Sequence, residues 1–238
     1  MKHICIFTGG NCPKKSNLEP FFAHYGRPNY IIAADSGLKS AIEYGFSPDI
    51  VLGDMDSLED TSLLDKINRN KVLEFPCDKD YSDTELAISK ALELFGSEEE
   101  NWITLLGGGG GRVDHLFAIF DIFSSSVLKR AMNVWIPGNS DDESETQALY
   151  FLKDGKTADI TDVFHSDYIS VCRSPKNFNT GYIETSGLQW EGGVFRKSGM
   201  PSLSNRIANE NEEGRVTMTA HGGDFVIILP IQANCYLR

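Results

Sequence analysis

Residues 103–115 read Ile-Thr-Leu-Leu-Gly-Gly-Gly-Gly-Gly-Arg-Val-Asp-His. The apolar run Ile103–Leu106 is typical of a buried strand, and the five glycines that follow allow the backbone to turn and to come close to a ligand. A helix is predicted next, over about 114–128, because apolar residues recur there at helical spacing: Leu116, Ile119, Phe120, Phe123 and Val127. A strand, a glycine-rich loop and a helix in this order indicate an α/β fold.

The same alternation is found on both sides of this stretch. Helices are predicted over Leu38–Tyr44, which Gly45 ends, and after Ser82-Asp83-Thr84-Glu85, which fits the capping-box pattern. Short apolar runs predict further strands at His3–Phe7, Tyr30–Ala34, Asp49–Leu52, Lys71–Phe75 and Asn133–Ile136. Strands that alternate with helices predict a mostly parallel, Rossmann-like sheet with flanking helices.

The pattern changes after residue 139. Residues 139–145 are polar and acidic, as in a linker. Short β runs between glycine turns follow, and no helix of ordinary length is evident after residue 155; these runs are Tyr168–Arg173, Val194–Lys197, Arg215–Ala220 and Phe225–Leu229. We therefore predict an α/β domain over 1–145 and a small all-β sandwich domain over 155–238.

The composition argues against some classes of partner. The chain has 238 residues, of which 41% are hydrophobic, and 22 Lys and Arg against 34 Asp and Glu give a net charge of −12. Binding to a nucleic-acid backbone or to an anionic membrane is therefore not expected. Residues 1–150 hold 13 of the basic and 24 of the acidic residues, a net of −11. This excess suits Mg²⁺ or a cationic substrate, although a solvated acidic surface explains it about as well.

The cysteines and the apolar runs indicate the cellular compartment in which the protein is expected. The five cysteines are scattered and form no Cys-x-x-Cys pair, so neither a zinc site nor a disulfide framework is predicted. The N-terminal apolar run Ile4–Phe7 is too short for a signal peptide, and no run is long enough to span a membrane. These features predict a soluble, cytoplasmic protein.

Chemical residue types recur where the predicted strands end. In an open parallel sheet, ligands bind outside the carboxyl ends of the strands. These ends deliver Asp35, then Asp54 and Asp56, then the segment Asp78–Glu85, and then Gly107–Asp114. We expect the four segments to converge on one edge of the sheet.

Two of these segments carry carboxylates in patterns that a metal site would use. Asp54 and Asp56 lie on the same side of an extended chain and can bind Mg²⁺ through oxygen, although a turn explains the pattern about as well. Ser82 is predicted mainly as the helix cap, and Asp83 is also explained as an acid in the first helical turn. Lys79 and Asp80 lie outside the helix and are less well explained in this way.

The glycine-rich loop predicts an anion site. Its backbone N–H groups, the start of the next helix and the guanidinium of Arg112 all suit phosphate oxygens. The sequence matches neither a P-loop nor the dinucleotide-binding glycine pattern, and a flexible loop is the alternative. Asp114 can also be read as a helix cap. In the second part of the chain, Trp190 could stack on a flat cationic ring, although packing in the core or at an edge is the commoner role.

Taken together, these segments resemble the thiamine pyrophosphokinase family. The matching runs, in the family's order and spacing, are Ala33-Ala34-Asp35-Ser36-Gly37, Pro48-Asp49 with Gly53-Asp54-Met55-Asp56-Ser57, Lys79-Asp80-Tyr81-Ser82-Asp83-Thr84-Glu85, and Gly110-Gly111-Arg112-Val113-Asp114-His115. The resemblance continues into Gly187-Leu188-Gln189-Trp190 and Ser204-Asn205, so it covers nearly the whole chain. Each motif alone is weak, but five in this order are specific.

The resemblance implies an α/β catalytic domain joined to a β-sandwich that helps to bind thiamine. It also implies a homodimer with active sites at the subunit interface. The implied reaction moves the β,γ-pyrophosphoryl group of ATP onto the thiamine hydroxyl, with Mg²⁺, and gives thiamine diphosphate and AMP.

Site residues are implied by the same resemblance. Asp54, Asp56 and Asp83 would hold Mg²⁺ and the phosphates, and one of them would help to deprotonate the hydroxyl. Arg112 would meet phosphate oxygens, with Asp114 beside them. The nucleotide side would include Asp35, Lys79, Asp80, Ser82, Gly110 and Gly111, and the thiamine side Trp190, Ser204 and Asn205.

Three other functions stay open at this point. Paired carboxylates that bind a metal–diphosphate also occur in sugar-nucleotide glycosyltransferases. A diphosphokinase that acts on another hydroxymethyl heterocycle, such as a pterin, is chemically closer. A non-catalytic thiamine-binding module is the third, although a sensor of a diphosphate should carry cations rather than carboxylates at the strand ends.

Overall fold

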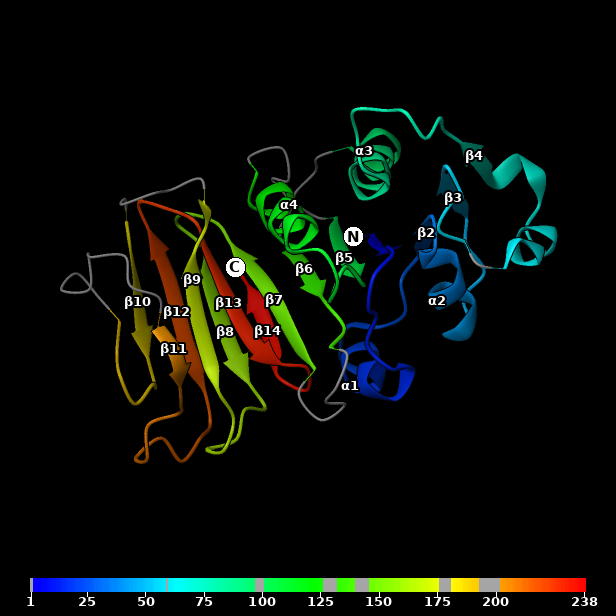
Figure 1. Ribbon diagram of the computed structural model, residues 1–238. Coiled ribbons are helices and arrows are strands. Elements are labelled where there is room, and N and C mark those ends of the chain that lie inside the picture. Colours follow the sequence, from blue (N-terminus) through cyan, green and yellow to red (C-terminus); the bar gives the residue numbers. More distant parts are fainter. Residues whose placement is uncertain are drawn as a thin grey trace.

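Parallel strands form one half of the main sheet (Figure 1). The computed structural model describes residues 2–58, 60–96, 101–125, 132–139, 146–175, 181–192 and 202–238. The order across this half is β4-β3-β2-β1-β5-β6, and all neighbours run parallel. The strands are β1 (His3–Phe7), β2 (Tyr30–Ala34), β3 (Ile50–Gly53), β4 (Val72–Glu74), β5 (Trp102–Leu106) and β6 (Met132–Ile136). Chain order reverses between β1 and β5, which is where open α/β sheets bind ligands.

Antiparallel strands form the other half, so the prediction of a mostly parallel Rossmann-like sheet is wrong beyond β6. The sheet continues in the order β6-β7-β13-β9-β11, and each of these pairs is antiparallel. Only residues 137–146 separate β6 from β7, and a parallel crossover needs roughly a dozen residues or more. The chain therefore turns back beside β6. The added strands are β7 (Gln147–Leu152), β9 (Ile169–Arg173), β11 (Ser202–Asn205) and β13 (Phe225–Pro230).

A second sheet of four antiparallel strands packs on one face of this half, which makes a β-sandwich (Figure 1). Its order is β10-β12-β8-β14. In β12, Val216, Met218 and Ala220 are buried and alternate with more exposed threonines, as the sequence predicts. The strands are β8 (Thr157–Thr161), β10 (Tyr182–Ser186), β12 (Val216–His221) and β14 (Asn234–Leu237). The predicted strand at Val194–Lys197 and most of the predicted linker at 139–145 lie outside the described residues.

The helices cover both faces of the parallel half (Figure 1). On one face, α1 (Lys15–Tyr25) and α2 (Gly37–Glu43) pack with the 3₁₀ helix η1 (Thr61–Lys66) and the second sheet around one core cluster. On the other face, α3 (Asp83–Phe95) and α4 (Val113–Ser124) pack around a second cluster. A further 3₁₀ turn, η2 (Arg69–Lys71), precedes β4. The loops at the carboxyl edge of the sheet therefore emerge between two layers of helices.

Helix α1 was not predicted from the sequence. It contains Pro20 in its interior, a residue that normally ends a helix because it lacks the N–H donor. Packing compensates: Leu18 and Phe21 are buried, and the hydroxyl of Tyr25 donates to the carbonyl of Cys235 in β14 (2.9 Å). Tertiary contact with the second sheet therefore overrides a local signal against the helix.

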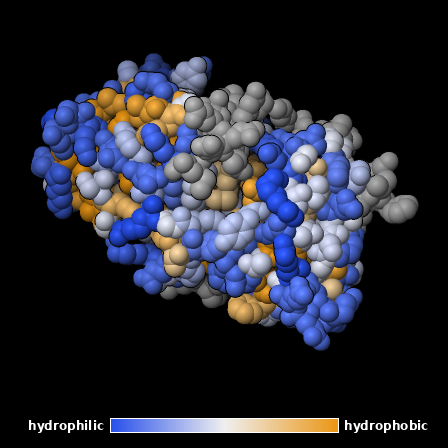
Figure 2. Space-filling view, turned by 180° about the vertical axis from the view of Figure 1, so that it is seen from behind, coloured by the Kyte–Doolittle hydropathy of each residue, from blue (hydrophilic) through white to orange (hydrophobic). Residues whose placement is uncertain are grey.

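The surface is mostly hydrophilic on the face that Figure 2 shows, where hydrophobic side chains come to the surface in separate groups. This agrees with the acidic composition. Within the described part of the chain, none of the helices combines the length and the apolar character needed to cross a bilayer.

The capping box of α3 gives a first prediction. The backbone N–H of Glu85 donates to Ser82 Oγ (3.3 Å), and the backbone N–H of Ser82 donates to Glu85 Oε2 (2.8 Å). Ser82→Ala leaves an N–H at the helix start without its acceptor, so we expect it to lower the free energy of unfolding by about 1 kcal/mol. Urea unfolding measures this. Ser89→Ala, an exposed change on the same helix, is the control and should cost nothing; an equal effect at both positions would contradict the capping role.

Candidate active site

The loops after β1 and β5 are bonded to each other at the point where the strand order reverses. The N–H of Gly108 donates to the carbonyl of Gly9 (2.7 Å), and Asn11 and Gly109 exchange two backbone hydrogen bonds (2.6 and 3.1 Å). A side chain at Gly109 would collide with the backbone of Gly138. Part of the glycine run is therefore explained by close backbone packing rather than by a ligand.

This bonding separates the glycines into two groups. The N–H groups of Gly107, Gly108 and Gly109 all donate within the protein. Those of Gly110 and Gly111, both with positive φ, donate to none of the described residues. The predicted anion-binding amides are thus narrowed to Gly110 and Gly111, which precede helix α4.

Carboxylates from two segments pair with one ammonium group, and a third carboxylate lies beside them. Lys79 Nζ lies 2.9 Å from Asp54 Oδ2 and 3.2 Å from Asp83 Oδ1. The three side chains are largely buried, with 13%, 10% and 22% of the Lys79, Asp54 and Asp83 side chains exposed. Asp35 is 7% exposed and lies beside them, next to Gly53. The predicted convergence of the ends of β2 and β3 with the start of α3 is therefore found.

The cluster shifts the pKa values of its members in opposite directions. The hydrogen bond from Lys79 lowers the pKa of Asp54. Burial raises the pKa of Asp83, and the neighbouring charges of Asp54 and Asp35 add to the rise, although Lys79 opposes it. Burial alone would lower the pKa of Lys79, but its bonds with Asp54 and Asp83 outweigh that effect and raise it. Lys79 is therefore a charged ammonium at neutral pH, and Asp83 is the carboxylate more ready to take a proton.

Gly53 makes the approach of Asp35 and Asp83 possible. Its φ is +139°, and a Cβ there would lie 3.2 Å from both Asp35 Cβ and Asp83 Oδ1. The hydroxyls of Thr8 and Thr84, 2.6 Å apart, join the end of β1 to the start of α3 beside it.

Gly53→Ala gives a second prediction. The new methyl group meets both carboxylate side chains in a backbone conformation that alanine rarely adopts, so we expect a loss of about 1–3 kcal/mol in the free energy of unfolding. Chemical denaturation measures it. Gly96→Ala is the matched control, because Gly96 also has positive φ but a Cβ there would meet none of the described residues within 4 Å. Equal losses would mean that contact with the carboxylates plays no part.

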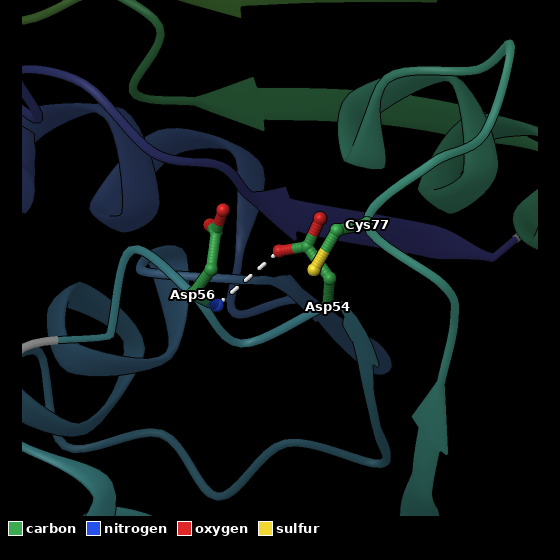
Figure 3. Close-up of side chains that lie close together, drawn as sticks. All are labelled: Asp54, Asp56 and Cys77. Carbon is green, nitrogen blue, oxygen red and sulfur yellow. Dashed lines mark hydrogen bonds between the residues drawn. The ribbon is translucent and has the colours of Figure 1, made fainter.

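In the view of Figure 3, Cys77 lies on one side of Asp54 and Asp56 on the other. The backbone N–H of Asp56 donates to Asp54 Oδ1 (3.2 Å), and the Asp56 side chain is exposed. Ligand atoms of Asp54, Asp56 and Cys77 all lie within 4.8 Å of one another. Cys77 was not predicted as a site residue; its place two residues before Lys79 is the only signal in the sequence.

Other predicted residues lie apart from the carboxylate cluster. Arg112 and Asp114 are exposed and pair with each other at the start of α4, with Arg112 Nε donating to Asp114 Oδ1 (3.1 Å). This pairing holds the pKa of Asp114 at about 2. Asp80 is exposed. Among the described contacts, none joins Arg112 or Asp114 to Asp54 or Asp83.

The predicted thiamine-side residues form a group on the β-sandwich. The amide of Asn205, 1% exposed, bonds to the N–H and carbonyl of Trp190 (3.2 and 2.8 Å) and so holds the 187–191 turn. Trp190 is 51% exposed. Ser204 is exposed and has a positive φ. Asn205 therefore has a structural role here, and Trp190 and Ser204 keep free surface.

A polar cleft of about 830 Å³ opens beside the ends of β1, β2 and β3. Its walls include Asn11, Ser36, Lys39, Ser57 and Asp60. The sequence analysis did not single out Asn11 or Lys39. The Gly9-Gly10 pair after β1 was the available signal for the first, because such a pair lets a loop approach a ligand.

Comparison with known proteins identifies the first part of this arrangement. Residues 25–136 match the model of the thiamin pyrophosphokinase catalytic domain. This part of the chain belongs to that family. The matched segment holds Asp35, the carboxylate–lysine cluster and the glycine-rich loop, and the resemblance inferred from the motifs is confirmed. The family consists of enzymes, so the prediction of an enzyme is confirmed at the family level.

Solved structures extend the likeness to the whole chain. A thiamin pyrophosphokinase family protein from Enterococcus faecalis is 18% identical, with 97% of this chain and 99% of that chain covered at a TM-score of 0.67. Thiamine pyrophosphokinase from Bacillus subtilis is 19% identical, covering 96% and 99% at 0.68. Thiamin pyrophosphokinase from Candida albicans is 15% identical, covering 96% and 89% at 0.69. At these identities the likeness shows the fold, including the sandwich. A search of curated proteins gave no match.

Proposed function

We propose that this protein transfers the β,γ-pyrophosphoryl group of ATP to the hydroxyl of thiamine. The bond between the α- and β-phosphates breaks, a bond forms between the thiamine oxygen and the β-phosphorus, and the products are thiamine diphosphate, AMP and a proton. The observation that carries the proposal is the pairing of Asp54 and Asp83 with Lys79, with Asp35 beside them, at the carboxyl ends of β2 and β3. The family of residues 25–136 supports it.

The residues present fit a divalent cation. Asp35 Oδ1 is buried and accepts no hydrogen bond from the described residues. The groups around it that could bind a metal are carboxylate oxygens, which are the ligands that Mg²⁺ prefers. Asp54, Asp56 and Asp83 would hold Mg²⁺, with the Cys77 thiol nearby. When bound, the ion would neutralise charge on the phosphates.

The chain itself would orient the two substrates. The N–H groups of Gly110 and Gly111, which donate to none of the described residues, and the guanidinium of Arg112 would bind phosphate oxygens. The cleft lined by Asn11 and Lys39 is large enough for a nucleoside. Pyrophosphoryl transfer requires mainly alignment and charge neutralisation, which these groups supply.

One carboxylate must take the proton of the thiamine hydroxyl. Asp83 is our candidate among the three, because in the metal-free protein burial raises its pKa whereas the hydrogen bond from Lys79 lowers that of Asp54.

We extend the proposal to the assembly. The α/β part, residues 1–145, would be catalytic, and the sandwich, residues 155–238, would bind thiamine through Trp190 and Ser204. Trp190 is half-exposed and suited to a cationic ring. A homodimer would place this surface over the catalytic edge of its partner. A cytoplasmic location stays a prediction.

The test is incubation of the purified protein with ATP, Mg²⁺ and thiamine, followed by chromatography of nucleotides and thiamine esters. We expect AMP and thiamine diphosphate in equal amounts. AMP formed only with a hydroxymethyl-pterin would assign the alternative diphosphokinase. Binding of thiamine without AMP would indicate a binding module, and sugar transfer from a nucleotide sugar a glycosyltransferase.

A further inference from the structure

Lys79 occupies the centre of the site in which the proposed function places a divalent cation. Its ammonium lies 2.9 Å from Asp54 Oδ2 and 3.2 Å from Asp83 Oδ1, and both carboxylates would be needed as ligands. An ammonium in this position competes with a metal for the same oxygens and repels it.

The cluster contains more carboxyl groups than ammonium groups. Three carboxyl groups, those of Asp35, Asp54 and Asp83, lie together at a place where Lys79 is the one ammonium among the described contacts. Asp35 is more than nine-tenths buried, faces the same glycine as Asp83, and its Oδ1 accepts no hydrogen bond from the described residues. A buried carboxylate oxygen without a partner is costly, and a cation of higher charge would relieve it.

The position of Lys79 in the chain allows it to leave. Lys79 lies in the segment between β4 and α3, and both of its neighbours, Asp78 and Asp80, are exposed. Its side chain has a flexible four-carbon stem, and α3 begins only at Asp83. Rotation of this side chain into solvent therefore breaks the two ion pairs without disturbing the helix.

We propose that Lys79 is a displaceable internal counter-ion, which holds Asp54 and Asp83 together in the metal-free protein and is expelled when a divalent cation binds them. The inference rests on the proposed function for the identity of the metal ligands. Its consequence is that the two carboxylates stay together without a metal. The affinity for the metal is then lower than it would be without the Lys79 ammonium.

Binding of Mn²⁺ alone to the purified protein, followed by electron paramagnetic resonance at pH 8, tests the exchange. We expect Lys79→Met to bind Mn²⁺ at least about tenfold more tightly than the unchanged protein, because the competing charge is gone. Lys90→Met is the matched control: it removes the same charge from α3, where Lys90 pairs only with Glu93 among the described contacts, and should leave the affinity unchanged. Equal or weaker Mn²⁺ binding by Lys79→Met, or no Mn²⁺ bound by any of the three proteins, would overturn the proposal.

A second measurement needs no substitution, in case Lys79→Met does not fold. Acylation of the unchanged protein, mapped by mass spectrometry, should modify Lys79 slowly without metal and several-fold faster with saturating Mn²⁺. Lys66, which is exposed, is the internal reference and should not respond. Unchanged or slower labelling of Lys79 with Mn²⁺ would show that the ammonium stays in place.

The two proposals fail separately. Tighter Mn²⁺ binding by Lys79→Met in a protein that forms no AMP from ATP and thiamine would support the exchange and remove the proposed function. AMP formation with unchanged Mn²⁺ affinity in Lys79→Met would support the function and remove the exchange.

Discussion

Asp56→Asn should lower the rate of thiamine diphosphate formation by about 10²- to 10³-fold, which corresponds to about 3–4 kcal/mol of transition-state stabilisation. Asp56 is the sharpest choice among the proposed ligands, because its side chain is exposed and lies outside the Lys79 ion pairs. Asp54→Asn would instead leave the buried Lys79 with one partner fewer, and would change stability as well as activity. Turnover at saturating ATP and thiamine, measured as AMP release, gives the result.

The control for Asp56→Asn is Asp65→Asn, an exposed change in η1. Both variants should unfold at the same urea concentration as the unchanged protein, and Asp65→Asn should keep full activity. The Asp56 variant should also bind Mn²⁺ more weakly. Near-normal turnover with Asp56→Asn would remove this residue from the metal role.

Lowering the pH from about 6.5 to 3 should destabilise the protein by about 3–5 kcal/mol through His3 alone. His3 lies in the central strand β1, is 4% exposed, stacks on Trp102, and places Nε2 2.9 Å from Thr104 Oγ1. Burial lowers the pKa of this imidazole to about 3. The unfolded chain takes up the proton near pH 6.5 and the folded protein does not, so stability is fully present above that pH and is lost as the pH falls toward 3.

Unfolding by urea at a series of pH values measures this dependence. His3→Gln keeps a hydrogen-bonding side chain beside Thr104 but cannot titrate, so its stability should fall less steeply over the same range. His165→Gln, at an exposed histidine, should follow the unchanged protein. Since acidic residues titrate in all three proteins, the difference between the curves isolates His3. Parallel curves for His3→Gln and the unchanged protein would contradict the assignment.

The sequence predicted the parallel strands well, because strands buried on both faces are read as short apolar runs. β1 and β2 fall within the bounds predicted for them, and the others differ by one residue at one or both ends. The capping box of α3 was also predicted, because its two hydrogen bonds join residues only three apart in the sequence. Features that depend on partners far along the chain were missed. Helix α1 was not predicted because Pro20 argues against a helix there. The pairing of β7 with β6 follows from a short connection and not from any residue pattern.

In the candidate site, too, features set by local sequence were predicted and features that depend on side-chain contacts were not. That Asp35, Asp54 and Asp83 meet was predicted, since they follow two parallel strand ends and a helix start. Asp114 was expected at the same edge, but it pairs with Arg112, and no described contact joins it to Asp54 or Asp83. The counter-ion role of Lys79 was not predicted, because it requires a side chain to fold back over the cluster. Cys77 was read only as one of five scattered thiols. The hydrogen bonds between the Asn205 amide and the backbone of Trp190 were not predicted, and a contact of Asn205 with thiamine stays a prediction.

The central place of β1 has a consequence for biosynthesis. β1 pairs with β2 on one side and with β5 on the other, and residues 102–106 leave the ribosome long after His3–Phe7. The nascent chain must therefore carry an apolar strand with one open side until about a hundred residues have been made. Chaperone contact, if it occurs during translation, should concentrate on this interval and end once Trp102–Leu106 has been released.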